Sequence, residues 1–135
     1  MQDFVHLHVH TQYSLLDGQA SVARLVDKAM KNGMKGIAVT DHGNMFGIKE
    51  FTNYVNKKNS GPKGEIKDLK KRIAGIEAGT VECEDKEAEI AACKAKIVEA
   101  ENKLFKPIIG CEMYVARRTM DLKEGKPDQS GYHLI

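Results

Sequence analysis

Three histidines alternate with apolar residues near the start of the chain, in the run His6-Leu7-His8-Val9-His10. Strand side chains alternate between two faces, so an extended segment over residues 4–11 places all three imidazoles on one face. Neutral imidazole is a common ligand of transition metals, and the carboxylate of Asp17 follows nearby. A purification tag would be an uninterrupted histidine run, and a solvated face rarely uses histidine three times. We therefore expect this segment to bind metal.

The elements that follow are predicted to alternate between helix and strand. Apolar residues at helical spacing predict a helix that Ser21 begins and Gly33 ends. A short β-like run covers residues 35–40, and a second helix follows until the Asn-Ser-Gly-Pro run at 59–62 breaks it. Residues 107–115 are predicted to form a third strand. The order strand, helix, strand, helix, strand indicates parallel βα units and an α/β fold.

Chemistry in such folds lies at the carboxyl ends of the strands. His10, Asp41, His42 and Glu112 all fall at or near predicted strand ends. Each has a structural alternative: His42 could be a turn residue with Asp41 capping the next helix, and Glu112 could pair with a lysine. His133, just before the last residues, could be a satisfied core histidine. Together, at strand ends, these alternatives are less favoured than a shared site.

Six side chains are therefore candidate metal ligands: His8, His10, Asp17, His42, Glu112 and His133. Mixed imidazole and carboxylate ligands suit zinc, manganese or iron, and six ligands exceed the need of one tetrahedral ion. We expect a cluster of two or three divalent ions. Such clusters hydrolyse phosphate esters through a metal-bound water, and Asp17 and His10 are the side chains we expect to contribute to catalysis.

Residues 63–105 do not fit a βα crossover and are predicted to be an inserted antiparallel helical hairpin. Gly79 is the predicted stop between the helices and Thr80 a possible N-cap. The first helix is mainly basic and the second mainly acidic, which favours a self-paired insertion over a partner-binding arm. The apolar residues of the two helices recur at heptad spacing: Ile66, Leu69, Ile73 and Ile76, then Ile90, Cys93, Ile97, Ala100 and Leu104.

Composition limits the other classes of protein. The chain has 135 residues and a net charge of +2, so no bulk basic field indicates nucleic-acid binding. No apolar run is long enough to span a bilayer, so we expect no membrane partner. The three cysteines, Cys83, Cys93 and Cys111, form no C-x-x-C pair, which argues against a disulfide framework and a cysteine zinc site. We predict a cytoplasmic protein.

Four segments resemble motifs of one known family. Residues 6–18 resemble the opening motif of the PHP (polymerase and histidinol phosphatase) domain, residues 40–47 and 106–116 its next two motifs, and residues 132–134 a fourth. Within this family the motifs resemble those of the bacterial DNA polymerase III alpha subunits more than those of histidinol phosphatases. The resemblance implies a distorted β/α barrel of which this chain holds the first three βα units. It implies the same six ligands, and it gives His6 no ligand role, so that His6 either supports a ligand or serves packing.

The resemblance also carries functional expectations. It implies the N-terminal part of a PHP domain over residues 1–135, from a DNA-synthesising polymerase whose PHP site acts as a metal-dependent 3′–5′ exonuclease. DNA and other replisome subunits would be the partners. The alternatives are a degenerate structural or partner-binding module, and a free-standing PHP phosphatase such as a histidinol phosphatase. Because the family's last three ligands and the polymerase core lie beyond this chain, we expect the isolated chain to be inactive.

Overall fold

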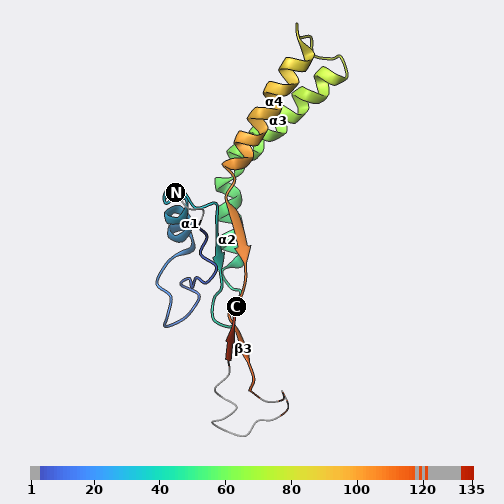
Figure 1. Cartoon of the computed structure of the whole chain (residues 1–135). Helices are drawn as coiled ribbons and strands as arrows, with labels where there is room; N and C mark the ends of the chain where they lie inside the picture. Colours follow the sequence, from blue (N-terminus) through green and yellow to red (C-terminus); the bar gives the residue numbers. More distant parts are fainter. Residues whose placement is uncertain (1–3, 118, 120, 122–131) are drawn as a thin grey trace. The chain divides into compact units, whose positions relative to one another are not determined.

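The computed structural model describes residues 4–117, 119, 121 and 132–135 (Figure 1). The predicted α/β class is confirmed. The chain divides into two compact units, Met1–Tyr54 with Lys106–Ile135, and Val55–Phe105. The elements in chain order are α1 (Val22–Lys31), β1 (Gly36–Val39), α2 (Ile48–Lys58), α3 (Ser60–Glu77), α4 (Lys86–Asn102), β2 (Lys106–Ile109), β3 (Met113–Val115) and β4 (Tyr132–Leu134).

The first unit is built around the parallel pair of β1 and β2. Their register runs from Gly36 opposite Lys106 to Val39 opposite Ile109. A Cβ atom at Gly36 would lie 2.6 Å from the carbonyl oxygen of Lys106, so glycine permits this close approach. Every residue of β1 is buried, whereas β2 is exposed along its length. β1 is therefore the central strand of this unit, and β2 lies at an edge.

Helix α1 packs one apolar face against β1. Val22, Val26 and Ala29 recur at helical spacing, and all three are buried. Gly33 follows the C-cap with a φ of 77°, a left-handed conformation that favours glycine. The predicted end of this helix is confirmed. Phe51 of α2 adds a fully buried aromatic ring to the same unit.

The predicted first strand, residues 4–11, is not regular. The segment runs beside β1 through two hydrogen bonds, from Ala38 N to His6 O (2.9 Å) and from Thr40 N to Val9 O (2.8 Å). Two steps along β1 thus correspond to three steps along the segment, as at a β-bulge. The Thr40 side chain accepts from Val9 N at 2.9 Å, which replaces a backbone partner at the shifted position. This offset of one residue prevents continuous strand pairing between the segment and β1.

The predicted third strand, residues 107–115, is also corrected: it divides into β2 and β3. At the break, Glu112 N donates to Asp41 O (3.0 Å) and Gly43 N donates to Glu112 O (2.9 Å). These bonds tie the chain to the segment after β1, and β3 then leaves the parallel pair. β3 pairs antiparallel with β4, with Tyr114 opposite His133. The second half of the predicted third strand therefore pairs antiparallel, which departs from the expected parallel order.

The expected helix break at residues 59–62 is wrong. Asn59 N donates to Val55 O, and Lys63 N donates to Asn59 O, so helical hydrogen bonding passes through the junction of α2 and α3. Pro62 lies in the first turn of α3, where a missing backbone N–H costs little.

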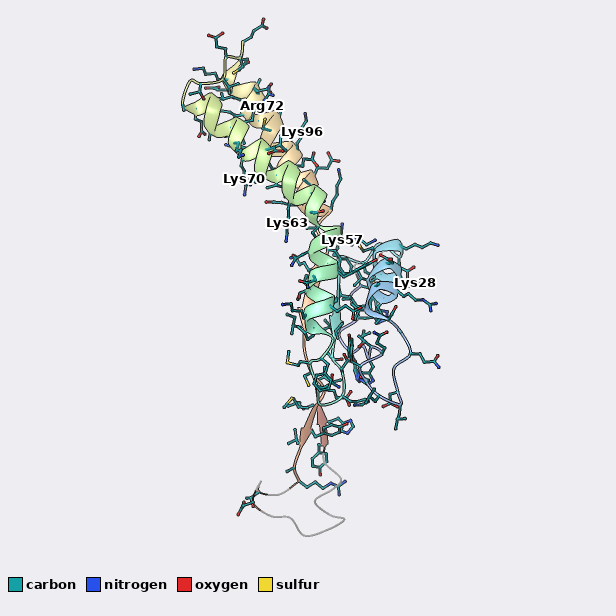
Figure 2. All side chains as sticks on the ribbon, turned by 180° about the vertical axis from the view of Figure 1, so that it is seen from behind. Lys28, Lys57, Lys63, Lys70, Arg72 and Lys96 are labelled. Atoms are coloured by element: carbon teal, nitrogen blue, oxygen red, sulfur yellow. The ribbon has the colours of Figure 1, made fainter. Side chains whose placement is uncertain are left out.

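The second unit contains the predicted antiparallel hairpin of α3 and α4. Ile76, Cys93 and Ala100 are buried between the helices, while the other predicted contact residues are partly buried. Arg72 of α3 forms an ion pair with Glu89 of α4 at 2.7 Å, as the opposite charges of the helices predict. Lys63 donates to Asn56 Oδ1 at 2.9 Å, and the exposed Lys70 also lies on α3 (Figure 2).

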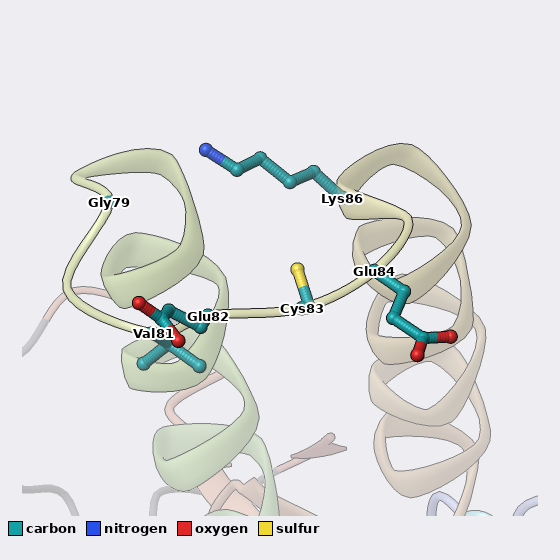
Figure 3. Close-up of a pocket in the computed structure, with 6 residues that line it drawn as sticks. All are labelled: Gly79, Val81, Glu82, Cys83, Glu84 and Lys86. Carbon is teal, nitrogen blue, oxygen red and sulfur yellow. The ribbon is translucent and has the colours of Figure 1, made fainter.

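The turn of the hairpin differs from the prediction in one respect. Gly79 ends α3 with a φ of 74°, as expected. Thr80, however, donates through its hydroxyl to Gly75 O and so closes α3. Asp85 caps α4 instead, accepting from Ala88 N at 3.0 Å. A surface hollow of about 460 Å³ lies at this tip, between Gly79 and Lys86 (Figure 3).

The base of the hairpin is fixed by one buried side chain. The Asn59 amide donates to Phe105 O at 2.8 Å and accepts from Phe105 N at 2.9 Å. Both hydrogen bonds are buried, so the amide takes the place of a backbone partner where the chain enters and leaves the hairpin. That the hairpin is an insertion into a PHP domain stays a prediction.

Candidate metal centre

A buried carboxylate organises the loop that follows the histidine segment. Asp41, directly after β1, is 1% exposed. It accepts hydrogen bonds from Thr11 N (2.6 Å), from the Thr11 hydroxyl (2.8 Å) and from the Ser14 hydroxyl (2.6 Å). Three donors around an ionised group in a low-dielectric site form strong, charge-assisted bonds. Asp41 therefore joins the end of β1 to the loop that leads to Asp17.

The same loop supports the backbone of His42. Ser14 Oγ accepts from His42 N at 3.1 Å, so Ser14 connects Asp41 with the next residue's peptide group. The Asn44 amide donates to His42 O (2.9 Å) and to Tyr13 O (3.1 Å). Hydrogen bonds to both of its backbone groups thus hold His42 in place.

Glu112 lies at the centre of a group of histidines. Its Oε2 atom is 2.9 Å from His8 Nε2 and 2.7 Å from His10 Nε2. The two Nε2 atoms are 3.1 Å apart, so His8 and His10 share one side of their segment, as alternation predicts. The other carboxylate oxygen, Oε1, accepts from His133 Nδ1 on β4. Glu112 therefore contacts imidazoles from two separate segments of the chain.

The histidines control the ionisation of Glu112. Its side chain is only 5% exposed, and this desolvation acts to raise its pKa. Hydrogen bonds from three histidines and the charge of a fourth, His42, outweigh desolvation and bring the pKa of Glu112 to about 2. Glu112 is therefore a buried carboxylate that keeps its negative charge at neutral pH.

Asp17 meets the cluster through His42. Its Oδ2 atom is 2.8 Å from His42 Nε2, and the Asp17 side chain is largely exposed. The rings of His42 and His10 lie 4.0 Å apart between centroids. Ligand atoms thus converge within 4.8 Å of one another in three overlapping groups: His8, His10 and Glu112; His10, Asp17 and His42; and His42, Glu112 and His133.

The donor set fits divalent metal ions. His42 Nδ1 is buried and, among the described residues, has no hydrogen-bond partner; Glu112 Oε2 is 3.5 Å away. A buried ring nitrogen without a partner is costly unless a ligand satisfies it. Two ligands of one tetrahedral zinc ion lie about 3.4 Å apart, from bonds of about 2.0–2.1 Å. The spacing of His8, His10 and Glu112 is a few tenths of an ångström shorter, so an ion would require a small outward shift.

All six predicted ligands lie together, and His6 does not join them. The His6 ring packs edge-on against Phe4, with 4.7 Å between centroids. The sequence placed Asp41 at a strand end, with a helix cap as the alternative, but did not predict its bonds to Thr11 and Ser14. The available signal was a carboxylate directly after a buried strand, because such a charge needs donors from elsewhere in the chain.

The hollow at the hairpin tip and one of about 670 Å³ along α1 contain none of the six residues. No described helix is both long enough and apolar enough to cross a lipid bilayer.

Comparisons with known proteins agree with these motifs. The family model of the PHP domain matches residues 6–135. The chain is 37% identical over 135 residues to the DNA polymerase III subunit alpha of Borreliella burgdorferi, and 35% identical over 133 residues to that of Treponema pallidum. Each alignment covers 98% of this chain and 8% of the relative. The subunit from Saccharopolyspora erythraea is 49% identical over 75 residues, 56% of this chain and 5% of the relative. This chain belongs to the PHP domain family.

Proposed function

We propose that this chain supplies part of a metal-dependent phosphoesterase site, of the 3′–5′ exonuclease type, in a protein that synthesises DNA. Two or three divalent ions of zinc, manganese or iron would be held by His8, His10, Asp17, His42, Glu112 and His133. In this proposal residues 1–135 are the N-terminal part of a PHP domain, with the hairpin at 63–105 as an insertion.

The environment of Glu112 carries the proposal. A buried, ionised carboxylate surrounded by imidazole nitrogens is costly to assemble for packing alone, because it removes several polar groups from water. The same arrangement is what a cluster of hard or borderline cations requires: negative charge at the centre and neutral nitrogen donors around it. The buried Nδ1 atom of His42, which has no hydrogen-bond partner in the part of the chain that the structure describes, supports the same proposal.

The ligands differ in exposure, and this difference suggests different roles. Divalent ions, once bound, lower the pKa of water and neutralise charge on a phosphoryl group. Glu112 is the buried anchor, whereas Asp17 is exposed at the rim and is free to face a substrate. His10 belongs to two of the three ligand groups and so links the anchor to the rim. Asp17 and His10 are therefore the side chains we place nearest to the reacting phosphate.

The assignment to DNA rests on the relatives. Two relatives that align with 98% of this chain are named DNA polymerase III subunit alpha, and the chain spans about 8% of their length. DNA as substrate and other replisome subunits as partners are therefore part of the proposal. Because a PHP site needs further ligands and a fixed geometry, we also propose that the 135-residue chain alone does not hydrolyse DNA.

A structural role is the second candidate, and one observation favours it. Ile108, Ile109, Met113, Tyr132 and Leu134 on β2, β3 and β4 are 37–63% exposed. Apolar strand surfaces of this kind commonly pack against further polypeptide. In this alternative the domain supports a neighbouring polymerase core or binds a partner, and its metal site is degenerate.

A nuclease assay with matched histidine variants separates the two candidates. The full-length protein that contains this chain is incubated with single-stranded and primed DNA in the presence of Mn²⁺ or Zn²⁺. We expect wild type and His6→Ala to release 3′ nucleotides, because His6 lies outside the cluster. His10→Ala should lower the rate of nucleotide release by about 100-fold or more, because a misplacement of the reacting groups by about 1 Å can already cost that much.

Each outcome has a defined meaning. Release that His10→Ala abolishes and His6→Ala retains supports the exonuclease proposal. Bound metal without release favours the structural role. Release that both variants retain would contradict the assignment of the site, as would DNA hydrolysis by the 135-residue chain that disappears in His10→Ala.

A further inference from the structure

Tyr114 stands beside the candidate metal ligands without belonging to them. It lies on β3 directly opposite His133 of β4, so the two side chains share a face of this antiparallel pair. Its ring meets the His133 ring edge-on, with 4.8 Å between centroids, and stacks on the His42 ring at 6.3 Å and 19°. Yet Tyr114 is 58% exposed.

The Tyr114 ring is held in position by backbone. Gly43 has a φ of 58°, and a Cβ atom there would lie 2.6 Å from Tyr114 Cε2. The ring therefore lies directly against the chain that carries His42, and any larger residue at position 43 would displace it. A ring that is already ordered loses little entropy when a ligand stacks on it.

Apolar side chains of the ligand-bearing loops are exposed in the same unit. Leu15 is 81% exposed and Leu16 is 106% exposed, in the loop that ends at Asp17. Leu16 has a φ of 75°, a strained conformation for a leucine, and such strain concentrates at functional sites. Phe46, four residues after His42, is 76% exposed. Exposed apolar side chains on the loops that carry the ligands suit contact with a nucleobase better than contact with a small, fully charged phosphate ester.

We propose that Tyr114 stacks on the terminal base of a single-stranded nucleic acid whose 3′-terminal phosphodiester lies at the metal centre. This inference rests on the proposed function and specifies its substrate class. Aromatic rings bind single strands in this way because every base offers a π-face, so the preference is for a base and not for a sequence. Tyr114 is then a specificity-determining residue, and the six ligands remain responsible for the metal.

The chain offers a matched control on the opposite face of the same strand pair. Tyr132 is 61% exposed and pairs with Val115, one position along from Tyr114, so alternation places it on the other face. Its ring carries the Arg117 guanidinium at 5.4 Å. Tyr132→Ala therefore removes an exposed tyrosine from the β3–β4 strand pair and leaves the face that contains His133 unchanged.

Photocross-linking locates the terminal base. The full-length protein is irradiated with an oligothymidylate that carries 5-iodouracil at its 3′ end, and the labelled peptide is identified by mass spectrometry. We expect the label on Tyr114 in wild type and in Tyr132→Ala, and on the introduced ring in Tyr114→Phe. Label found exclusively on residues outside the PHP domain would overturn the proposal, whether or not the protein cleaves DNA.

A binding comparison measures the contribution of the base. Wild type should bind the oligonucleotide about 5- to 150-fold more tightly than the same strand with an abasic 3′ end, the range expected for one stacked base. Tyr114→Ala should remove this difference, and Tyr114→Phe and Tyr132→Ala should retain it. Cross-linking at Tyr114 without cleavage would contradict the proposed nuclease but not this inference. Cleavage with equal base dependence in wild type and Tyr114→Ala would contradict this inference alone.

Discussion

Replacing Asp41 tests whether one buried carboxylate holds the loop of the metal centre. Asp41→Ala removes the acceptor of three hydrogen bonds and leaves Thr11 N, which belongs to a fully buried residue, without a partner. A hydrogen bond to a charged group is worth about 1.5–3 kcal/mol, and these bonds are not additive. Leaving a buried donor such as Thr11 N unsatisfied typically costs about 1–3 kcal/mol. We expect a loss of that size in the free energy of unfolding, a large part of the stability of an ordinary domain.

Asp41→Asn separates shape from charge. An asparagine Oδ1 can still accept from Thr11 N and Ser14 Oγ, but the charge is gone and the second oxygen becomes a donor facing Thr11 Oγ1. The loss in unfolding free energy should be smaller than for alanine. Affinity for metal should still fall about 10- to 100-fold, as for other groups that orient metal ligands, because the loop carries Asp17 and supports His42.

The assay is urea unfolding of the 135-residue chain, followed by circular dichroism, with metal titration of each variant that folds. A loss below about 1 kcal/mol for Asp41→Ala would refute the reasoning, since surface substitutions have effects of that order. Metal affinity of Asp41→Asn equal to that of wild type would show that the loop keeps its position without the charge.

Three further predictions concern other parts of the chain. The pKa of Glu112 is about 2, below the usual ~4.3. The ionised side chain therefore stabilises the folded state above pH ~4.3, and this contribution is lost as the pH falls toward 2. The dependence of the unfolding free energy on pH in this range should flatten in Glu112→Gln but not in Glu77→Gln. Asn59→Ala should speed hydrogen exchange of the Phe105 amide by about tenfold or more, and unchanged exchange would contradict the role of the Asn59 hydrogen bonds at the base of the helical hairpin. Gly36→Ala should destabilise the β1–β2 pair by about 1–3 kcal/mol in urea unfolding, and a neutral effect would contradict the close approach.

The positions of the candidate ligands were largely predictable from local pattern. His8 and His10 share a side because side chains still alternate over these residues, although the segment pairs irregularly with β1. His42 and Glu112 meet because each follows a strand of the same parallel pair. The first rule is local, whereas the second follows from the expected parallel order of the strands.

The departures have physical causes that spacing does not reveal. Nothing in residues 107–115 shows that Glu112 N would bond to Asp41 O and divide the strand, because that partner is about 70 residues away. The continuation from α2 into α3 depends on Pro62 falling in the first turn, a shift of one or two residues from a helix-breaking position. The role of Asp41 depends on Thr11 and Ser14, which lie 27 to 30 residues earlier.

Anomalous diffraction tests whether the six side chains form a metal centre around Glu112. Crystals of the full-length protein are grown with Zn²⁺ or Mn²⁺, and data are collected on both sides of the metal absorption edge. The account predicts anomalous peaks about 2.0–2.2 Å from nitrogens of His8, His10 or His42 and from a carboxylate oxygen of Glu112 or Asp17. Crystals of Glu112→Gln should lose at least one peak. An absence of peaks at these residues, with metal bound elsewhere or not at all, would contradict the account.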